Sequence, residues 1–488
     1  MLLLATMTSF SQVSYRNRIE KEISTDFIND NVHPLGKNGV MVVDRGGRSY
    51  KKLLEWKYEF YNTSLEKESE KSLLIGDKMR KWGEYKTKTH VHQLFRDNNG
   101  LIEMVSVNMV TKEFTHVKGD ISGKVKLLGL TVLVDIAVCI ASDKKTTQLA
   151  VINWVTGKSE FIPISIEGYK ANKLDITHIQ VIEESKEFFV YITAVLSKTE
   201  TKSYVVRLDD HGKKQDVFKI EDGGERNIVS ISASKIGDDE YIFSGTFSLT
   251  DVNQSQGVFI LQRSAGKTGF KNFVKFQDLD NFMSYFPDQV ESIMGNKEER
   301  VEKRGKELLV NCNVSSHEII NQGTEHIMLG EVYFPTYKKV TTTSNGTSTT
   351  RTEFDGYDYN HAFVVKFDNE GNVIWDDGFE LVIYQKTRKV KKFISVAEQN
   401  ESSITLVYAS GSYVHSKSVA YETGEAVDTE ESNKIETGIE GEETQFSQSD
   451  IEFWYDNYYL SYGYQLIKNK TAEGKKKRKV FYVVKVEF

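Results

Sequence analysis

The sequence predicts an all-β fold, and three observations support this prediction. The 488-residue chain holds 24 Tyr and 27 Phe, residues that suit half-buried pleated sheets. Hydrophobic residues make up 39% and charged residues 27%, a balance typical of a chain that buries a core. Short apolar runs separated by polar turns recur about every 40–60 residues, a repeat typical of stacked β units, with no helical pattern between them.

The repeat is clearest in one short hairpin pattern. Residues 364–375 (VVKFDNEGNVIW) match residues 204–214 (YVVRLDDHGKK), with Gly371 and Gly212 in the same place. Each copy reads as a strand, a polar turn whose glycine supplies a positive φ, and a second strand. Looser copies occur at 58–65, 151–158 and 419–425.

An apolar strand precedes each hairpin, and a further apolar run often precedes that strand. The preceding strands lie at 134–140, 188–194, 241–247, 326–332 and 458–464. Four strands per unit predict a single β-propeller. Eight four-stranded blades are expected, near residues 26–76, 82–121, 124–166, 174–221, 226–276, 306–383, 390–437 and 446–488, with seven blades as the alternative because the first two units are the least regular. The last unit shows only three strands, so a strand near residues 13–23 is expected to complete it, giving one domain over residues 12–488 closed by its N- and C-terminal strands.

Two insertions interrupt the repeat. Residues 278–306 combine helical spacing with high charge, which predicts a short helical insertion. Residues 338–354 are rich in Thr and Ser and predict an extended hairpin with Asn345 and Gly346 at its tip. Both are expected to project from one rim of the propeller.

The first residues have the pattern of a secretory signal. Residues 1–11 hold an apolar core and a small-residue exit without the usual basic start, which suggests that the signal is truncated at its beginning. The exit at Ser9–Gln12, together with residues 356–375, resembles uncharacterised secreted β-propeller proteins of Bacteroidetes-type bacteria. That resemblance implies a fold and a periplasmic or extracellular location, and it implies no catalytic residues. No transmembrane segment is expected in the mature chain, because residues 1–11 are too short to span a bilayer.

Residues 364–375 resemble three structural motifs, a calcium loop, a quinoprotein docking repeat and a β-hairpin. A calcium loop would use Asp368, Asn369 and Glu370, but the glycine comes at the fourth position instead of the sixth. Asp368 and Trp375 also resemble the two ends of the tryptophan-docking repeat of quinone-dependent dehydrogenases, although their spacing is one residue too short. The hairpin reading is preferred, so no metal and no cofactor are predicted.

The candidate site residues flank the Thr-rich insertion. Glu331 and His361 are the candidates for acid–base chemistry, in a hydrolase or lyase acting on polysaccharide or peptide. The aromatic candidates for binding are Tyr333, Tyr337, Tyr357 and Tyr359. The competing interpretation is a set of cross-strand pairs that stabilises a sheet.

Three histidines are candidates for a metal site, and two cysteines are candidates for a disulfide. His90, His92 and His116 could meet across a hairpin, although an exposed strand face is preferred to a metal site. Cys139 and Cys312 could form one disulfide or remain free thiols.

The sequence does not specify an activity. No nucleophile elbow, P-loop or dinucleotide motif is present, and a net charge of −7 gives no reason to expect nucleic acid. The preferred hypothesis is therefore a non-catalytic binding protein of the periplasm or cell envelope whose partner is a protein or a glycan. An enzyme with a funnel site is the alternative.

Overall fold

The computed structural model describes residues 14–24, 26–121, 125–143, 146–224, 226–286, 309–344, 347–396, 402–427, 430–470 and 477–488. These residues form β-strands and short 3₁₀ helices, with no α-helix among them. The chain divides into two compact units. Unit 1 comprises Met1–Leu74, Thr336–Asp358 and Val382–Phe488, and unit 2 comprises Ile75–Pro335 and Tyr359–Leu381.

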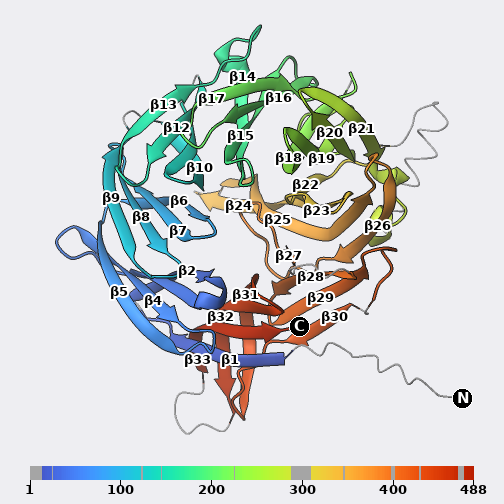
Figure 1. Ribbon diagram of the computed structural model, residues 1–488. Helices are drawn as coiled ribbons and strands as arrows, with labels where there is room; N and C mark the ends of the chain where they lie inside the picture. Colours follow the sequence, from blue (N-terminus) through green and yellow to red (C-terminus); the bar gives the residue numbers. More distant parts are fainter. Residues whose placement is uncertain are drawn as a thin grey trace, which may run out of the picture. The chain divides into compact units, whose positions relative to one another are not determined.

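Unit 2 contains five antiparallel sheets whose strands follow one another in chain order (Figure 1). The first sheet consists of β6 (Arg80–Lys86), β7 (His90–Arg96), β8 (Leu101–Asn108) and β9 (Phe114–Asp120), and the second of β10 (Lys126–Leu133), β11 (Ile136–Ser142), β12 (Thr147–Asn153) and β13 (Ser159–Pro163). The third consists of β14 (Leu174–Ile182), β15 (Glu187–Val195), β16 (Thr201–Leu208) and β17 (Lys214–Lys219). The fourth consists of β18 (Asn227–Gly237), β19 (Glu240–Ser248), β20 (Gly257–Ser264) and β21 (Lys267–Lys275). The fifth has the order β22 (Asn313–Ser316), β24 (Glu325–Ser344), β25 (Thr347–Phe367) and β26 (Val373–Glu380), and β23 (Ile320–Gln322) pairs with β24. The 3₁₀ helix η2 (Ala171–Lys173) leads into β14.

Unit 1 contains three four-stranded sheets and the outer parts of β24 and β25. One sheet is β2 (Phe27–Pro34), β3 (Val40–Gly46), β4 (Leu53–Tyr61) and β5 (Lys67–Gly76), with η1 (Gly36–Asn38) between its first two strands. A second is β27 (Ser395–Val396), β28 (Ser403–Ser410), β29 (Tyr413–Ala420) and β30 (Glu431–Lys434). The third has the order β1 (Ser14–Glu22), β33 (Lys477–Glu487), β32 (Tyr458–Asn469) and β31 (Glu442–Tyr455).

The chain has an eight-bladed β-propeller fold, as the repeat predicts. The described residues form eight sheets of at least four strands, seven of them in chain order and the last with β1 added beside β33. The sheets match the eight expected units closely: the fourth unit, expected near 174–221, is the sheet Leu174–Lys219. Eight blades are therefore confirmed over the alternative of seven.

The hydrophobic core lies between neighbouring sheets. In unit 2, Val138 and Val151 pack with Phe188 and Val190 from the next sheet, all 4% exposed or less. Burying each such side chain contributes on the order of 1.5–3 kcal/mol. In unit 1, Val42 of the β2–β5 sheet likewise packs with residues of the β31–β33 sheet. Within each unit, neighbouring sheets are thus stabilised by packing face to face, which explains why apolar runs dominate these strands.

The turn after the third strand of a unit also contacts the preceding sheet. Gly157, with a φ of +77°, lies against β9 so closely that a Cβ there would come 2.3 Å from the carbonyl oxygen of Lys118. Gly371, the turn glycine of the 364–375 hairpin, packs against Phe270 and Ile260 in the same way. These glycines supply both the backbone conformation and the close approach.

The last sheet is completed by a strand from the start of the chain. Strand β1 pairs antiparallel with β33, from Ser14 opposite Glu487 to Glu22 opposite Val480, and the blue β1 lies beside the red β33 in Figure 1. This is the segment expected near residues 13–23. Residues 1–13, which include the expected signal, lie outside the described residues.

The two insertions differ in how far they can be followed. Residues 278–286 contain the 3₁₀ helix η4 (Phe282–Tyr285), preceded by η3 (Phe276–Asp278), while residues 287–308 lie outside the described residues. The Thr-rich hairpin is present as the outer parts of β24 and β25, with Thr341 hydrogen-bonded to Thr350 (2.9 Å) and Thr343 to Ser348 (3.0 Å). Its expected tip, residues 345–346, lies outside the described residues.

Candidate functional site

Glu331 is fully buried on β24 and is bound by a histidine. The Nε2 atom of His317 lies 2.7 Å from Glu331 Oε1, and His317 is 14% exposed at its side chain. This histidine follows β22, whose register places Ser315 opposite Glu331. Sequence reasoning missed His317, because only the pairing of β22 with β24 brings it to Glu331.

His361 is also buried, but its surroundings are mainly aromatic. Its ring lies 5.0 Å from the ring of Phe282 and 5.2 Å from that of Phe286, and its Nδ1 atom is 2.9 Å from the side-chain amide of Asn360. Burial lowers the pKa of His361 to about 3, so the imidazole is uncharged at neutral pH and no imidazolium is available to act as a general acid. Because Glu331 and His361 have different partners, the acid–base hypothesis stays a prediction.

The four candidate tyrosines form two separate groups. In unit 2, the rings of Tyr333 and Tyr359 lie 5.5 Å apart, and Tyr359 is buried. In unit 1, Tyr337, Phe354 and Tyr357 form a chain of edge-to-face contacts, with centroids 6.0 Å and 5.0 Å apart. The Tyr333–Tyr359 and Tyr337–Phe354 contacts are cross-strand pairs of the kind that the competing interpretation expects, whereas Phe354 and Tyr357 both lie on β25. Only the second group presents large exposed rings.

We call Tyr337, Phe354 and Tyr357 the aromatic ribbon. Tyr337 is 63% exposed and Phe354 is 37% exposed. The strand β22 pairs with β24 only as far as Tyr333, and β26 pairs with β25 from His361 onward, so the ribbon lies beyond both partner strands. Two strands alone are marginally stable in water, and the aromatic contacts contribute to holding them together.

A run of basic residues contacts the ribbon and was not identified from the sequence. The basic segment, Lys386–Lys392, contains Lys386, Arg388, Lys389, Lys391 and Lys392. Its backbone pairs with the ribbon where the Tyr357 N–H donates to the Thr387 carbonyl oxygen at 2.8 Å. The sequence does carry a signal for this segment, because no acidic residue occurs from position 381 to 396.

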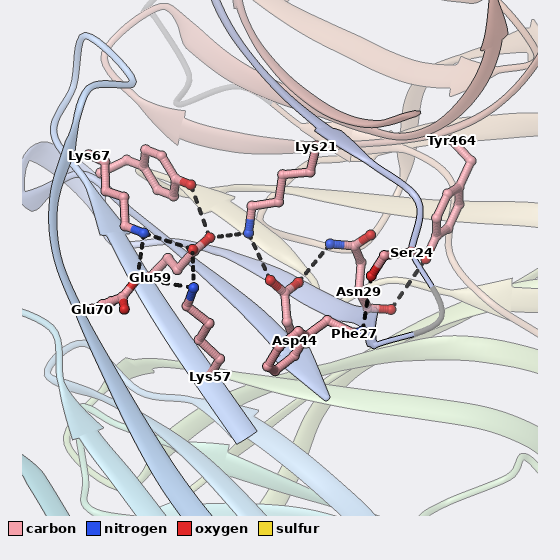
Figure 2. Close-up of polar contacts among 11 residues, drawn as sticks. Lys21, Ser24, Phe27, Asn29, Asp44, Lys57, Glu59, Lys67, Glu70 and Tyr464 are labelled. Carbon is pink, nitrogen blue, oxygen red and sulfur yellow. Dashed lines mark hydrogen bonds and ion pairs between the residues drawn. The ribbon is translucent and has the colours of Figure 1, made fainter. Parts of the chain in front are cut away.

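A second polar cluster surrounds Glu59 on the β2–β5 sheet (Figure 2). Glu59 is 5% exposed, and its carboxylate accepts from Lys67 at 2.8 Å and from Lys57 at 3.1 Å and also pairs with Lys21 of β1. Lys21 additionally donates to Asp44 at 2.8 Å. Burial acts to raise the pKa of Glu59, but the hydrogen bonds and charges of the three lysines outweigh it and hold the pKa at about 2.

The charges in this cluster balance one another. Glu70 binds Lys57 at 3.0 Å and Lys67 at 2.5 Å, so each of the two lysines has two carboxylate partners. The Tyr61 hydroxyl donates to Glu59 at 3.0 Å. Because every lysine of this cluster already pairs with carboxylates, the cluster stabilises the pairing of its strands and leaves none of its lysines available for a ligand.

The three histidines are not brought together. His90 and His92 have ring centroids 5.6 Å apart on β7, and both rings contact Trp154. His116 instead binds Glu103, with 2.7 Å between Nε2 and Oε2. No group of three or more His, Cys, Asp or Glu in the described part of the chain is placed to hold a metal ion.

Residues 364–375 form the hairpin turn between β25 and β26. The Asp368 carboxylate accepts from the backbone N–H groups of Glu370 and Asn372, both at 2.8 Å, and so uses its oxygens to cap the turn. Asp209 does the same for His211 at 2.9 Å and Lys213 at 2.8 Å in the sister copy. The aspartate marks a structural turn.

Both cysteines are free and buried. Burial raises the pKa of each thiol, Cys139 and Cys312, to about 12, which leaves them protonated and unreactive at neutral pH. Of the two possibilities left open by the sequence, the free thiols are found.

The described residues include no helix with the length and apolar character needed to cross a membrane. Comparisons with known proteins give no family. No family model matches the sequence, and no curated protein sequence matches it significantly.

Several solved structures resemble the fold at low identity. The propeller of Dos1 has a TM-score of 0.41 at 9% identity, covering 96% of this chain and 95% of that one. The β-propeller domain of the Trilobed protease from Pyrococcus furiosus has a TM-score of 0.37 at 10% identity, covering 83% and 95%. A prolyl endopeptidase has a TM-score of 0.39 at 10% identity, covering 92% of this chain, which spans 56% of the length of that enzyme. None of these likenesses assigns an activity to this chain.

Proposed function

We propose that this chain is a non-catalytic binding protein of the periplasm or cell envelope that engages a protein or glycan partner through the aromatic ribbon. One observation carries the proposal: Tyr337 and Phe354 present large rings to solvent on a two-stranded extension outside the sheet core. Exposed Tyr and Phe combine apolar contact area with few rotatable bonds, so ordering them on binding costs little entropy. Interfaces are enriched in such residues for this reason.

The location in the periplasm or envelope rests on the sequence. Residues 1–11 have an apolar core and a small-residue exit. The expected mature N-terminus is Gln12. Fractionation of the native host, with mass spectrometry of the chain's N-terminus, tests this location, and an intact Met1 in a cytoplasmic fraction would contradict it.

The binding role is tested by capture from envelope extract with the full chain. The double variant Tyr337→Ala/Phe354→Ala should lose at least tenfold of the partner recovered, because truncating interface aromatics is typically among the most costly changes. Tyr50→Ala removes another ring that is 73% exposed in unit 1 and should leave recovery unchanged.

Thermal unfolding separates a binding defect from a folding defect. The ribbon rings contribute about 0.5–1.5 kcal/mol per pair to stability, so the double variant should stay folded. Equal recovery by the wild type and the folded double variant would remove the ribbon from the proposal.

A further inference from the structure

The basic segment stands out against the charge of the whole chain. The net charge is −7, yet the five cations of Lys386–Lys392 have no acidic residue within positions 381–396. Lys386 pairs with Asp355 at 3.3 Å, and Lys391 pairs with Asp450. Arg388 and Lys389 are exposed, and neither makes an ion pair with any described residue. Two positive groups are therefore free to meet a negative partner.

The basic segment contacts the strand of the aromatic ribbon. Asp355, next to Phe354 on β25, binds Lys386 and also Lys338, with 2.9 Å to the latter. The backbone bridge between Tyr357 and Thr387 fixes the segment one residue before Arg388. The basic segment, which is not itself a strand, thus lies beside the part of β25 that carries Phe354 and Tyr357, within unit 1.

A small cavity of about 40 Å³ adjoins the basic segment. Its lining combines the polar side chains of Gln385, Thr387, Ser410 and Gln448 and the Lys391–Asp450 ion pair with the apolar side chains of Ile383, Phe393 and Ala409. Amides, hydroxyls and a carboxylate are suited to hydrogen bonds with sugar hydroxyls.

We propose that the ribbon and the basic segment together bind an acidic polysaccharide. Arg388 and Lys389 pair with its carboxylates, and the rings of Tyr337 and Phe354 pack on the apolar faces of its sugars. The cavity takes up a hydroxyl-bearing substituent. This inference rests on the proposed function and names the partner class. The hydrogen-bonding side chains of the cavity favour a sugar polymer over an acidic peptide.

Binding of the full chain to defined polymers tests the inference. Polygalacturonate is the acidic glycan probe, dextran the neutral one, and oligothymidylate and polyglutamate the other anions. The chain should bind polygalacturonate more tightly than any of the other three, and added salt should weaken this binding because the charges are exposed.

A charge variant and a matched control locate the contact. Arg388→Gln/Lys389→Gln should weaken polygalacturonate binding about tenfold, since each exposed charge contact contributes a few-fold. Lys213→Gln/Lys214→Gln removes the same charge from two exposed lysines of unit 2 and should change binding less than twofold. Equal losses in the two variants would show a non-specific charge effect and overturn the inference.

The two proposals fail in different ways. Absent polygalacturonate binding, or equally tight binding of polyglutamate or oligothymidylate, overturns the acidic-glycan inference even when the ribbon still captures a partner from extract. The proposed function is overturned by a different result, in which the folded Tyr337→Ala/Phe354→Ala variant captures as much partner as the wild type.

Discussion

Replacing Glu59 by glutamine tests whether the lysine cluster stabilises the fold through charge. The glutamine keeps the size of the side chain and a carbonyl oxygen that can accept from the Tyr61 hydroxyl. It removes the negative charge that faces Lys21, Lys57 and Lys67. Lys21 keeps Asp44, and the other two keep Glu70, so each lysine loses one of its two partners.

The magnitude follows from the pKa of Glu59. Its value of about 2 in the folded chain lies below the usual 4.5, so ionised Glu59 stabilises the folded state above pH 4.5, and this stability is lost as the pH falls toward 2. The difference corresponds to at most about 3 kcal/mol at neutral pH, and to about 1 kcal/mol at pH 3. These are upper limits, because Lys57 and Lys67 are partly exposed and water screens them.

Urea unfolding of the wild type and the Glu59→Gln variant at pH 7 and pH 3 measures the effect. The difference in unfolding free energy between the two proteins should be largest at pH 7 and should shrink by more than half at pH 3. Glu70→Gln is the matched control: it removes a charge from Lys57 and Lys67 at an exposed position and should destabilise the chain less. A difference between wild type and Glu59→Gln that stays constant with pH would refute the electrostatic explanation.

Three further predictions concern the turns and the thiols. Gly157→Ala should lower the unfolding free energy by about 2 kcal/mol or more, because the added Cβ meets the backbone of the neighbouring sheet. Gly168 also has a positive φ but open space around it, so Gly168→Ala should lower the unfolding free energy by only about 1 kcal/mol. Equal effects of the two substitutions in thermal unfolding would show that contact with the neighbouring sheet is unimportant. Cys139 and Cys312 should resist a thiol reagent in the folded chain and both react after denaturation without reductant, whereas two unreactive thiols in the denatured chain would indicate a disulfide. Asp368→Ala should lower the unfolding free energy by about 1 kcal/mol, because the turn loses its side-chain cap. Neither calcium nor a chelator should shift the melting temperature of the wild type. A calcium-dependent shift that is absent in the variant would instead support a calcium site at this turn.

The repeat was readable from the sequence because its signals are local. A strand, an aspartate and a turn glycine recur within about ten residues, as at Asp209 and Asp368, and both aspartates cap the turn in the structure. Blade positions therefore followed from spacing alone. The expected strand near residues 13–23 required one further physical argument, that an unpaired edge invites aggregation.

The site was less readable because its contacts join distant segments. His317 reaches Glu331 through the register of β22 on β24, and Lys21 reaches Glu59 because β1 pairs with β33. The pairing of β22 with β24 has no local sequence signal, and the expected pairing of β1 does not by itself show that Lys21 meets Glu59. The environment of His361 depends likewise on Phe282 and its neighbours, which lie about eighty residues earlier in a segment that reads as an insertion.

The pairing of β1 with β33 has a consequence for the timing of folding. Glu20 and Arg478 form an ion pair across these strands although they are 458 residues apart in the chain. During synthesis β1 leaves the ribosome before β33, so β1 has no sheet to join while the intervening strands are made. Closing such a long loop is slow, and we expect this sheet to be the last of the eight to form. Until then the edge of β33 is open, and this interval is when the protein is most exposed to misassembly with a second copy.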